Sequence, residues 1–288
     1  MRPAPFELDT PQELGEALTL VQDRGDDAVL LAGGQTLIPL LNMRIVRPDR
    51  IIDLGGVQSL RSITRTGTEI SVGAMTRQED VETSPDVRQM VPLLAHAAGF
   101  VGQPQTRSRG TLGGSLALSS SFSELCVCLL ALSGRVRADS MRGSRWLDGQ
   151  DLFADYLTNS LDDDEILTEA RFAEIEPDAR WGFSELKFRG CDFPIVIAAV
   201  VLAFDGDLCT GARVALGGAA STPTRVESAE RDLLGRPVDA EAIEHVAAAA
   251  ERSADPFDDL HAPAGYRRHA AAVQLTQAMR MAMTSEAR

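Results

Sequence analysis

The sequence predicts an α+β fold made of two unlike domains. The first 56 residues follow the order strand, turn, short helix and second strand. Residues 182–216 instead carry three consecutive strand-like runs joined by tight turns, which is typical of an antiparallel meander. Helical spacing of apolar residues dominates the rest of the chain after this meander.

A polar segment containing a proline, at residues 174–179, separates these two patterns. We therefore expect a two-part N-terminal domain at residues 1–175 and a C-terminal domain at residues 176–288. Within the first, residues 1–56 form the β-α-β part and residues 57–175 form a second α+β part.

In the first part, Thr10-Pro11-Gln12-Glu13 matches a capping box, and apolar residues at helical spacing follow it through Val21. The pattern then predicts a strand at 28–31, a short helix at 37–44 and a second strand at 50–54.

The second part alternates between short strands and helices. Strands are expected at residues 61–65, 69–72, 135–138 and 166–172. Thr76 to Glu79 matches a second capping box, and Ser84-Pro85 indicates the start of a helix that reaches about residue 98. Ser123 caps a further apolar helix at 124–132, and residues 152–157 are expected to be helical.

The C-terminal domain is expected to hold a three-stranded antiparallel sheet followed by helices. The strand runs are 182–188, 195–204 and 211–216. The helices are expected at 227–234, 241–253 and 264 to about 283.

Composition excludes several classes of function. The 288 residues are 44% hydrophobic and 24% charged, as in ordinary folded domains. A net charge of −14 argues against binding to nucleic acid or to an anionic membrane surface. No apolar run approaches the roughly 20 residues that span a bilayer, and the N-terminus lacks a signal-peptide core, so a cytoplasmic location is expected.

The sequence offers no catalytic or metal-binding cluster. The four cysteines form no Cys-x-x-Cys pair, and we expect them to be small buried hydrophobes. Rossmann, P-loop and His-Glu-x-x-His motifs are absent, and the four histidines are scattered. We therefore assign no catalytic residue and no metal ligand to this chain.

Two double-glycine turns are the most informative local feature. In the first, Leu31-Ala32-Gly33-Gly34-Gln35-Thr36, the glycines lie between a strand and a helix, where backbone amides and a helix dipole suit an anion. A tight turn that needs glycine only for its conformation is an equally good interpretation of this segment alone.

The second turn, Gly110-Thr111-Leu112-Gly113-Gly114-Ser115, follows the same logic and adds hydroxyl groups. Two such turns could offer unshielded N–H groups to one diphosphate, so together they favour a dinucleotide. Gly55-Gly56 and Gly217-Gly218 show that the glycine pair alone proves nothing, and we interpret both as strand-ending turns.

Two charged residues are further candidates. Glu124 could accept hydrogen bonds from ribityl or ribose hydroxyls, or it could simply be an acid at a helix N-terminus. Lys187 lies between Leu186 and Phe188 and could cover a ring system, or it could lie on the solvent face of its strand.

These residues resemble the FAD-binding medium subunit of the molybdenum hydroxylases, the carbon monoxide dehydrogenase and xanthine dehydrogenase family. The resemblance covers nearly the whole chain in the same order. The segments that carry the resemblance are residues 32–39, 48–54, 71–76, 105–115, 164–167 and 186–189, and Gly265-Tyr266-Arg267.

The resemblance implies an N-terminal FAD-binding domain of the PCMH type. Residues 32–36 and 111–115 match the two pyrophosphate-binding turns of the family. The cofactor site would be completed by Leu31, Val101, Gly110, Ser120, Glu124, Leu167 and Lys187. Ser119-Ser120-Ser121-Phe122 replaces an Ala-Asp-Pro-like segment, and serines at 108 and 115 replace asparagines. Because this loop differs from the family pattern, the resemblance fixes neither the shape of the loop nor the access of solvent to the flavin.

The resemblance also implies partners. A small subunit with two [2Fe–2S] clusters would deliver electrons to FAD, a large molybdopterin subunit would oxidise substrate, and the complex would be a dimer of heterotrimers. An external acceptor would receive the electrons. A stand-alone FAD oxidase of the related two-turn fold is the alternative, although no histidine lies near either turn to tether a flavin. A scaffold that has lost flavin is disfavoured by the intact glycines.

Overall fold

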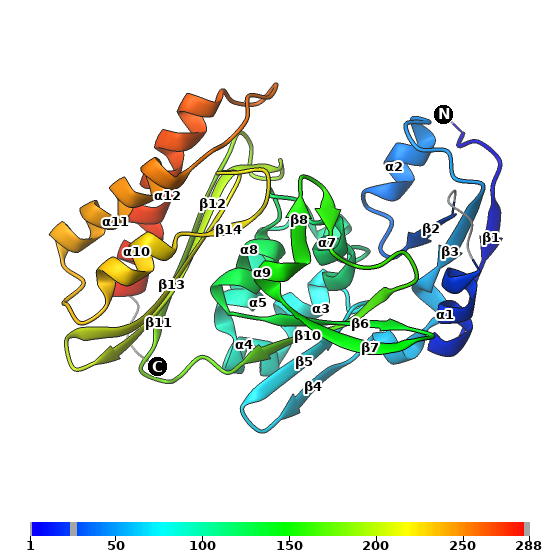
Figure 1. Cartoon of the computed structure of the whole chain (residues 1–288), viewed down its shortest axis with the longest axis horizontal. Helices are drawn as coiled ribbons and strands as arrows, with labels where there is room; N and C mark the ends of the chain where they lie inside the picture. Colours follow the sequence, from blue (N-terminus) through cyan, green and yellow to red (C-terminus); the bar gives the residue numbers. More distant parts are fainter. Residues whose placement is uncertain (1, 24–27, 285–288) are drawn as a thin grey trace.

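The computed structural model describes residues 2–23 and 28–284, and it confirms the α+β fold. Three bodies follow one another along the longest axis (Figure 1), in the order of the sequence. In the part of the chain that is described, no helix is both long enough and apolar enough to cross a membrane.

The first body is a small parallel sheet with two helices. Its strands lie in the order β1-β3-β2, so the predicted β-α-β unit is confirmed and gains an edge strand that was not predicted. The elements are β1 (Glu7–Asp9), α1 (Leu14–Gln22), β2 (Ala28–Leu31), α2 (Leu37–Asn42) and β3 (Arg50–Asp53). Two 3₁₀ turns, η1 (Leu54–Gly56) and η2 (Gln58–Leu60), follow β3, where a strand-ending turn was expected.

Both predicted capping boxes are wrong. Helix α1 begins at Leu14 with Glu13 as its N-cap, and no side chain caps it. Helix α3 begins at Gln78 with Arg77 as its N-cap, also without a side-chain cap. The Thr76 hydroxyl donates to the carbonyl of Ser62 instead (3.2 Å), because the tertiary partner outcompetes the local one.

The second body is an antiparallel sheet covered on one side by helices. Its strand order is β4-β5-β10-β6-β7, which makes β10 the central strand. The strands are β4 (Ile63–Thr66), β5 (Glu69–Gly73), β6 (Arg135–Ser140), β7 (Gly143–Asp148) and β10 (Ile166–Ala173). Strand β7 was not predicted, and a two-stranded pair, β8 (Phe153–Asp155) with β9 (Thr158–Asn159), replaces the helix expected at 152–157.

The helices of this body are short, and one prediction of length is wrong. The helix expected from Ser84 to residue 98 is two helices, because Pro92 has no N–H to continue the first one. The predicted helix start at Ser84-Pro85 and the predicted Ser123 cap are confirmed, since the two serine hydroxyls accept from the N–H groups of Val87 and Cys126. The helices are α3 (Gln78–Thr83), α4 (Pro85–Met90), α5 (Pro92–Ala98), α6 (Pro104–Arg107), α7 (Leu112–Leu118), α8 (Glu124–Ala131) and α9 (Gly149–Leu152).

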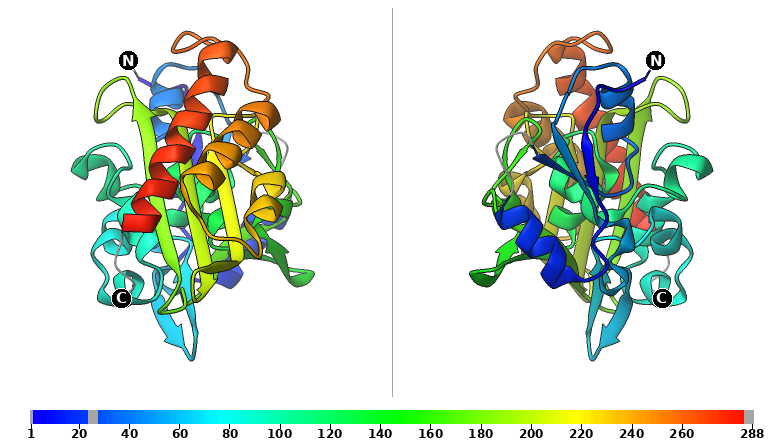
Figure 2. Two further views of the ribbon diagram at one scale, coloured as in Figure 1. Left: turned by 90° about the vertical axis from the view of Figure 1, so that its left-hand side faces the viewer. Right: turned by 90° about the vertical axis from the view of Figure 1, so that its right-hand side faces the viewer.

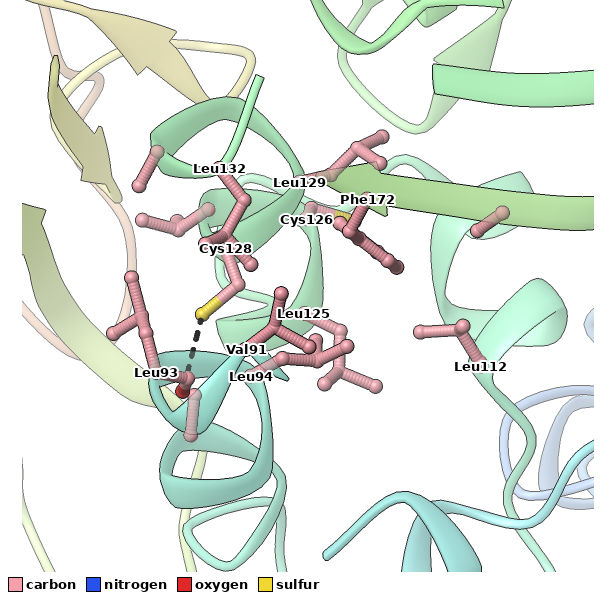
Figure 3. Packing of buried hydrophobic residues seen from close by; sticks show 14 of the residues in the cluster. Val91, Leu93, Leu94, Leu112, Leu125, Cys126, Cys128, Leu129, Leu132 and Phe172 are labelled. Atoms are coloured by element: carbon pink, nitrogen blue, oxygen red, sulfur yellow. Dashed lines mark hydrogen bonds between the residues drawn. The ribbon is translucent and has the colours of Figure 1, made fainter. Parts of the chain in front are cut away.

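Helix α8 is buried along its whole length in the largest hydrophobic core (Figure 3). Its Cys128 points toward α5, where the sulfur lies 4.0 Å from the carbonyl of Leu93. Burial raises the pKa of Cys126 to about 12 and that of Cys128 well above its usual value. Cys126, Cys128 and Cys209 are the buried small residues that were expected, whereas Cys191 is exposed.

The third body is a long antiparallel sheet in the order β11-β12-β13-β14. The predicted three-stranded meander is confirmed, and a short fourth strand extends it. The elements are β11 (Arg180–Lys187), β12 (Pro194–Asp205), β13 (Leu208–Gly217), β14 (Thr224–Arg225), α10 (Glu227–Leu233), α11 (Ala240–Ser253) and α12 (Ala264–Thr284). The three helices cover one face of the sheet (Figure 2).

The other face of this sheet packs on the second body. Strand β11 contacts α5, and β12 and β13 contact α8. Along β12, alternate residues enter different cores: Ile197, Ala199 and Val201 join the core of the second body, and Val196, Ala198 and Val200 join the helical core. The unbroken apolar run at 195–204 is therefore a strand that is buried on both faces.

Gly182 fixes the distance between β11 and α12. A Cβ atom at this position would lie 1.9 Å from the carbonyl oxygen of Ala278. We expect Gly182→Ala to lower the free energy of unfolding by about 3 kcal/mol, because backbone rather than a flexible side chain has to move. Denaturant unfolding measures this loss.

Gly211→Ala on strand β13 of the same sheet is the matched control, since its Cβ would meet only the Ala203 side chain at 3.4 Å. It should be as stable as the wild type or slightly more so. Equal stability of the two variants would contradict the close packing of α12 on β11.

Candidate functional site

A cavity of about 330 Å³ lies where the first body meets the second. Both glycine turns line it, together with α2, the start of α7 and the start of β10. Of the sequence-predicted site residues, the cavity brings together Ala32, Gly33, Gly34, Gln35, Thr36, Gly110, Thr111, Gly113, Gly114, Ser115 and Leu167.

The two turns touch each other through their backbones. A Cβ atom on Gly33 would lie 2.5 Å from the carbonyl oxygen of Arg109 and 2.7 Å from the Cα of Gly110. A Cβ atom on Gly114 would lie 3.3 Å from the Cβ of Ala32. Glycine is therefore needed here for close approach of two chain segments, a reason that the sequence alone did not supply.

The first turn offers free backbone donors. Within the described residues, none of the N–H groups of residues 33–36 donates a hydrogen bond. Gly34 adopts the left-handed conformation (φ 73°), which bends the chain and points successive amides into one concave surface. Helix α2 has only six residues, so the expected helix dipole adds little and the amides themselves carry the positive potential.

The second turn differs from what we expected. Its glycines lie in the first turn of α7, with Thr111 as N-cap. The N–H of Gly113 donates to the carbonyl of Ala74 (2.8 Å), and that of Gly114 to the hydroxyl of Thr111 (3.1 Å). The expectation of unshielded N–H groups is thus wrong for these two glycines. Their missing side chains let Gly113 lie against Ala74 and Gly114 lie against Ala32 of the first turn.

The cavity is close to neutral despite the acidity of the chain. Glu165 is the one carboxylate among the described lining residues, and Arg145 pairs with it at 2.7 and 2.8 Å. The carbonyl oxygen of Gln78 is buried and has no partner in the described part of the chain, while its amide nitrogen donates to Ser115 Oγ (2.9 Å). An anionic ligand with hydroxyl donors fits these amides and this free acceptor.

A second cluster lies at the contact between β11 and the second body. The Lys187 ammonium donates to the carbonyl of Phe100 (2.5 Å) and to Glu124 Oε1 (3.0 Å), and it forms an ion pair with Glu185 Oε1 (2.7 Å). The side chains of Lys187 and Glu124 are each only 6% exposed, so the alternative of a solvent-facing lysine is wrong.

The remaining predicted residues do not line the cavity. Leu112 is buried in the core, and Val101 packs against the same core. Leu31 continues β2, and Ser120 Oγ accepts from the N–H of Phe122 (3.2 Å). Hydrogen bonds from Ser121 to Ala220, and from Gly218 to Ser121, hold the serine loop in place.

Two family models match the chain in succession. The model described as "FAD binding domain in molybdopterin dehydrogenase" matches residues 4–172, and "CO dehydrogenase flavoprotein C-terminal domain" matches residues 181–282. The chain belongs to this FAD-binding family. It is a flavoprotein and an oxidoreductase subunit.

Known proteins of this FAD-binding family match this chain along nearly its whole length. It is 35% identical over 268 residues to the 6-hydroxypseudooxynicotine dehydrogenase complex subunit alpha of Paenarthrobacter nicotinovorans, covering 93% of this chain and 90% of that protein. It is 32% identical to the carbon monoxide dehydrogenase medium chain of Hydrogenophaga pseudoflava, covering 98% of both.

Solved structures agree with the sequence comparison. A carbon monoxide dehydrogenase chain from Hydrogenophaga pseudoflava superposes with a TM-score of 0.96, at 32% identity, and the match covers 98% of this chain and 99% of that one. Quinoline 2-oxidoreductase from Pseudomonas putida 86 gives a TM-score of 0.92 at 30% identity, with 98% of each chain covered.

Sequence reasoning missed several residues of this FAD-binding chain. Gln78, Ala74 and Glu165 line the cavity, and Glu185 completes the Lys187 cluster. Gln78 was seen only as part of a capping box, and Glu165 only as part of a family motif. No local pattern reveals them, because tertiary contacts and not spacing in the sequence bring them to the site.

Thr111 holds the second turn in its helical conformation. Its side chain is buried, and its hydroxyl accepts the N–H of Gly114. We expect Thr111→Val to lower the free energy of unfolding by about 1 kcal/mol, because a buried N–H loses its partner. Thr111→Ser keeps the acceptor and should retain most of the stability. Denaturant unfolding of both variants tests the cap, and equal losses for valine and serine would refute it.

Proposed function

We propose that this chain is the FAD-carrying electron-transfer subunit of a multi-subunit molybdenum hydroxylase. It would receive electrons from [2Fe–2S] clusters on a small partner subunit and pass them to an external acceptor. The observation that carries this proposal is the neutral cavity lined by both turns, where the N–H groups of residues 33–36 have no acceptor among the described residues.

The residues present fit the cofactor. A diphosphate would take the amides of residues 33–36, and Thr36 and Ser115, which carry hydroxyl groups, also line the cavity. Leu161, Ile166 and Leu167 give the cavity an apolar side that suits a ring or a sugar edge. When bound, FAD would supply the redox chemistry, and the protein groups would position it and adjust its electrostatic surroundings.

We further propose that Leu31, Val101, Leu112, Ser120, Glu124 and Lys187 support the cofactor from outside this cavity. Glu124 and Lys187 form a buried pair on the side of the third body. A dinucleotide is too large to fit whole in a cavity of about 330 Å³. Its flavin end would therefore extend out of the cavity toward this side. No side chain needs to act as an acid or base in electron transfer, which agrees with the assignment of no catalytic residue.

The expected assembly is part of the same proposal. The partners would be a small iron–sulfur subunit and a large molybdopterin subunit, in a dimer of heterotrimers located in the cytoplasm. The relatives' names, "complex subunit alpha" and "medium chain", support a multi-subunit complex. We propose the domain division at residue 175, within the interval 173–180 that separates the two family matches.

Isolation of the native complex distinguishes this proposal from the stand-alone oxidase. We expect iron and molybdenum to co-purify with the flavin, on separate polypeptides. A homogeneous chain that turns over a substrate with flavin alone would support the oxidase instead.

Gln35 allows a test that leaves the fold intact. It is exposed and lines the cavity, whereas Gly33 and Gly113 touch backbone and their variants would report folding. We expect Gln35→Glu to weaken FAD binding about 10-fold, or ~1.4 kcal/mol, because the new carboxylate repels the diphosphate. Flavin fluorescence on titration of the apoprotein gives the dissociation constant.

Gln150→Glu is the matched control, since Gln150 is also exposed and does not line this cavity. It changes the net charge by the same amount and should bind FAD like the wild type. If both variants bind FAD as the wild type does, the diphosphate does not lie at the first turn.

A further inference from the structure

Strand β11 presents alternate residues to the second body, and their chemistry changes along the strand. Trp181 and Phe183 form the aromatic end and pack around His96 of α5, with ring centroids 5.3 and 5.8 Å away. Glu185 and Lys187 form the ionic end, against Glu124 of α8.

The ionic end holds two carboxyl groups and one ammonium, all of them buried. The exposed fractions are 6% for Lys187, 6% for Glu124 and 5% for Glu185. Lys187 donates to Glu124 and to the carbonyl of Phe100, and it forms an ion pair with Glu185. Lys187 is therefore an ammonium that can balance only one of the two carboxylates.

Glu185 carries the unbalanced oxygen. Its Oε2 is buried and accepts no hydrogen bond from any residue that the structure describes. An ionised carboxylate in that position is costly, whereas a protonated one removes the excess charge and turns Oε2 into a donor. The carboxyl of Glu124 is the neighbouring acceptor for this proton, and its interaction with Glu185 favours the protonated form of Glu185.

We propose that Glu185 is a positioning residue for Lys187 and that it carries the one proton of this buried carboxyl pair, which it releases near neutral pH. The Lys187 cluster is then neutral while Glu185 is protonated and has a charge of −1 when it is not.

The neighbouring groups agree with this assignment. Burial and the Glu124 charge together raise the pKa of Glu185 to about 7, against the lowering effect of Lys187. Burial also raises the pKa of Glu124, against the lowering effect of Lys187. From α5, burial lowers the pKa of His96, which favours its neutral form, and on α8 the Cys126 thiol stays protonated because burial raises its pKa to about 12. Strand β12 places Ile197 beside Glu185 and adds no charge.

The sign of the pH dependence follows from this proton. A carboxyl whose pKa is about 7 in the folded chain and near 4.5 in the unfolded chain binds its proton more tightly when folded. Its contribution to stability is complete below about pH 4.5, decreases as the pH rises to about 7, and is constant above that.

Glu185→Gln removes the proton and keeps the side-chain shape, with an N–H₂ in place of the protonated oxygen. Between pH 5.5 and 7.5 the unfolding equilibrium constant of the wild type should rise about 20-fold relative to that of the variant. Infrared spectroscopy of the folded apoprotein should show a protonated-carboxyl band that titrates near pH 7 and is missing from the variant.

Two further variants complete the test. Glu124→Gln should also abolish the titrating band, because the single remaining carboxylate pairs with Lys187. Glu79→Gln, at an exposed position on α3, should keep it. Parallel stability profiles of wild type and Glu185→Gln, or a band that persists in Glu185→Gln, would overturn the proposal.

A consequence for the cofactor rests on the proposed function, in which Lys187 supports bound FAD. Between pH 6 and 8.5, FAD should bind the wild type at least about 3-fold more weakly as the cluster acquires its negative charge, whereas Glu185→Gln should show no such change. If the carboxyl band titrates but FAD affinity stays constant, Glu185 holds the proton without influencing the cofactor. Failure of the chain to bind FAD at any pH would contradict the proposed function and leave the carboxyl proton standing.

Discussion

The candidate site depends on the contact between two stretches of bare backbone. Gly33 lies against the Arg109–Gly110 peptide, and Gly114 lies against Ala32, so a single methyl group at the first position would separate the turns. This contact joins the small parallel sheet to the second body and forms the floor of the cavity. Packing and ligand access therefore require the same residue type at the same positions, and a double glycine in the sequence cannot tell the two apart.

The two turns in this contact use their backbone amides differently. The second turn uses its glycine amides to bond Ala74 and Thr111, and it is rigid for that reason. The first turn is different, since its amides at residues 33–36 have no acceptor in the part of the chain that the structure describes. A chain with a net charge of −14 can still bind an anion there, because Arg145 neutralises the one carboxylate of the described lining and local dipoles act over a shorter range than the global charge.

The sequence predicted elements well where burial imposes a period on the residues. The meander of β11, β12 and β13 and the helices α10 to α12 were found because each buries a regular apolar face. Errors arose where one local signal competes with a tertiary contact. Thr76 matches a cap but bonds Ser62, and the short strands β1, β7 and β14 depend on pairing that no local pattern reveals.

The same limit applies to the site. The glycine turns were found because small residues are visible in a sequence, and family resemblance added Glu124 and Lys187. Glu185 and Gln78 were missed, since an acid on a strand and a glutamine at a helix start have many ordinary uses. Their importance comes from burial and from an oxygen left without a donor, which only three-dimensional structure reveals.

Strand β11 connects these features. One face of β11 packs closely on α12, because Gly182 has no side chain to keep the helix away. The other face makes the aromatic and ionic contacts to the second body. A displacement of α12 would therefore move Glu185 and Lys187 relative to Glu124. Since buried charges tolerate little change in geometry, the packing of a helix far from the glycine turns affects the electrostatics of the side toward which the flavin would extend. The C-terminal body thus forms a wall of the proposed site. Strand β11 belongs both to the core of that body and to the proposed site.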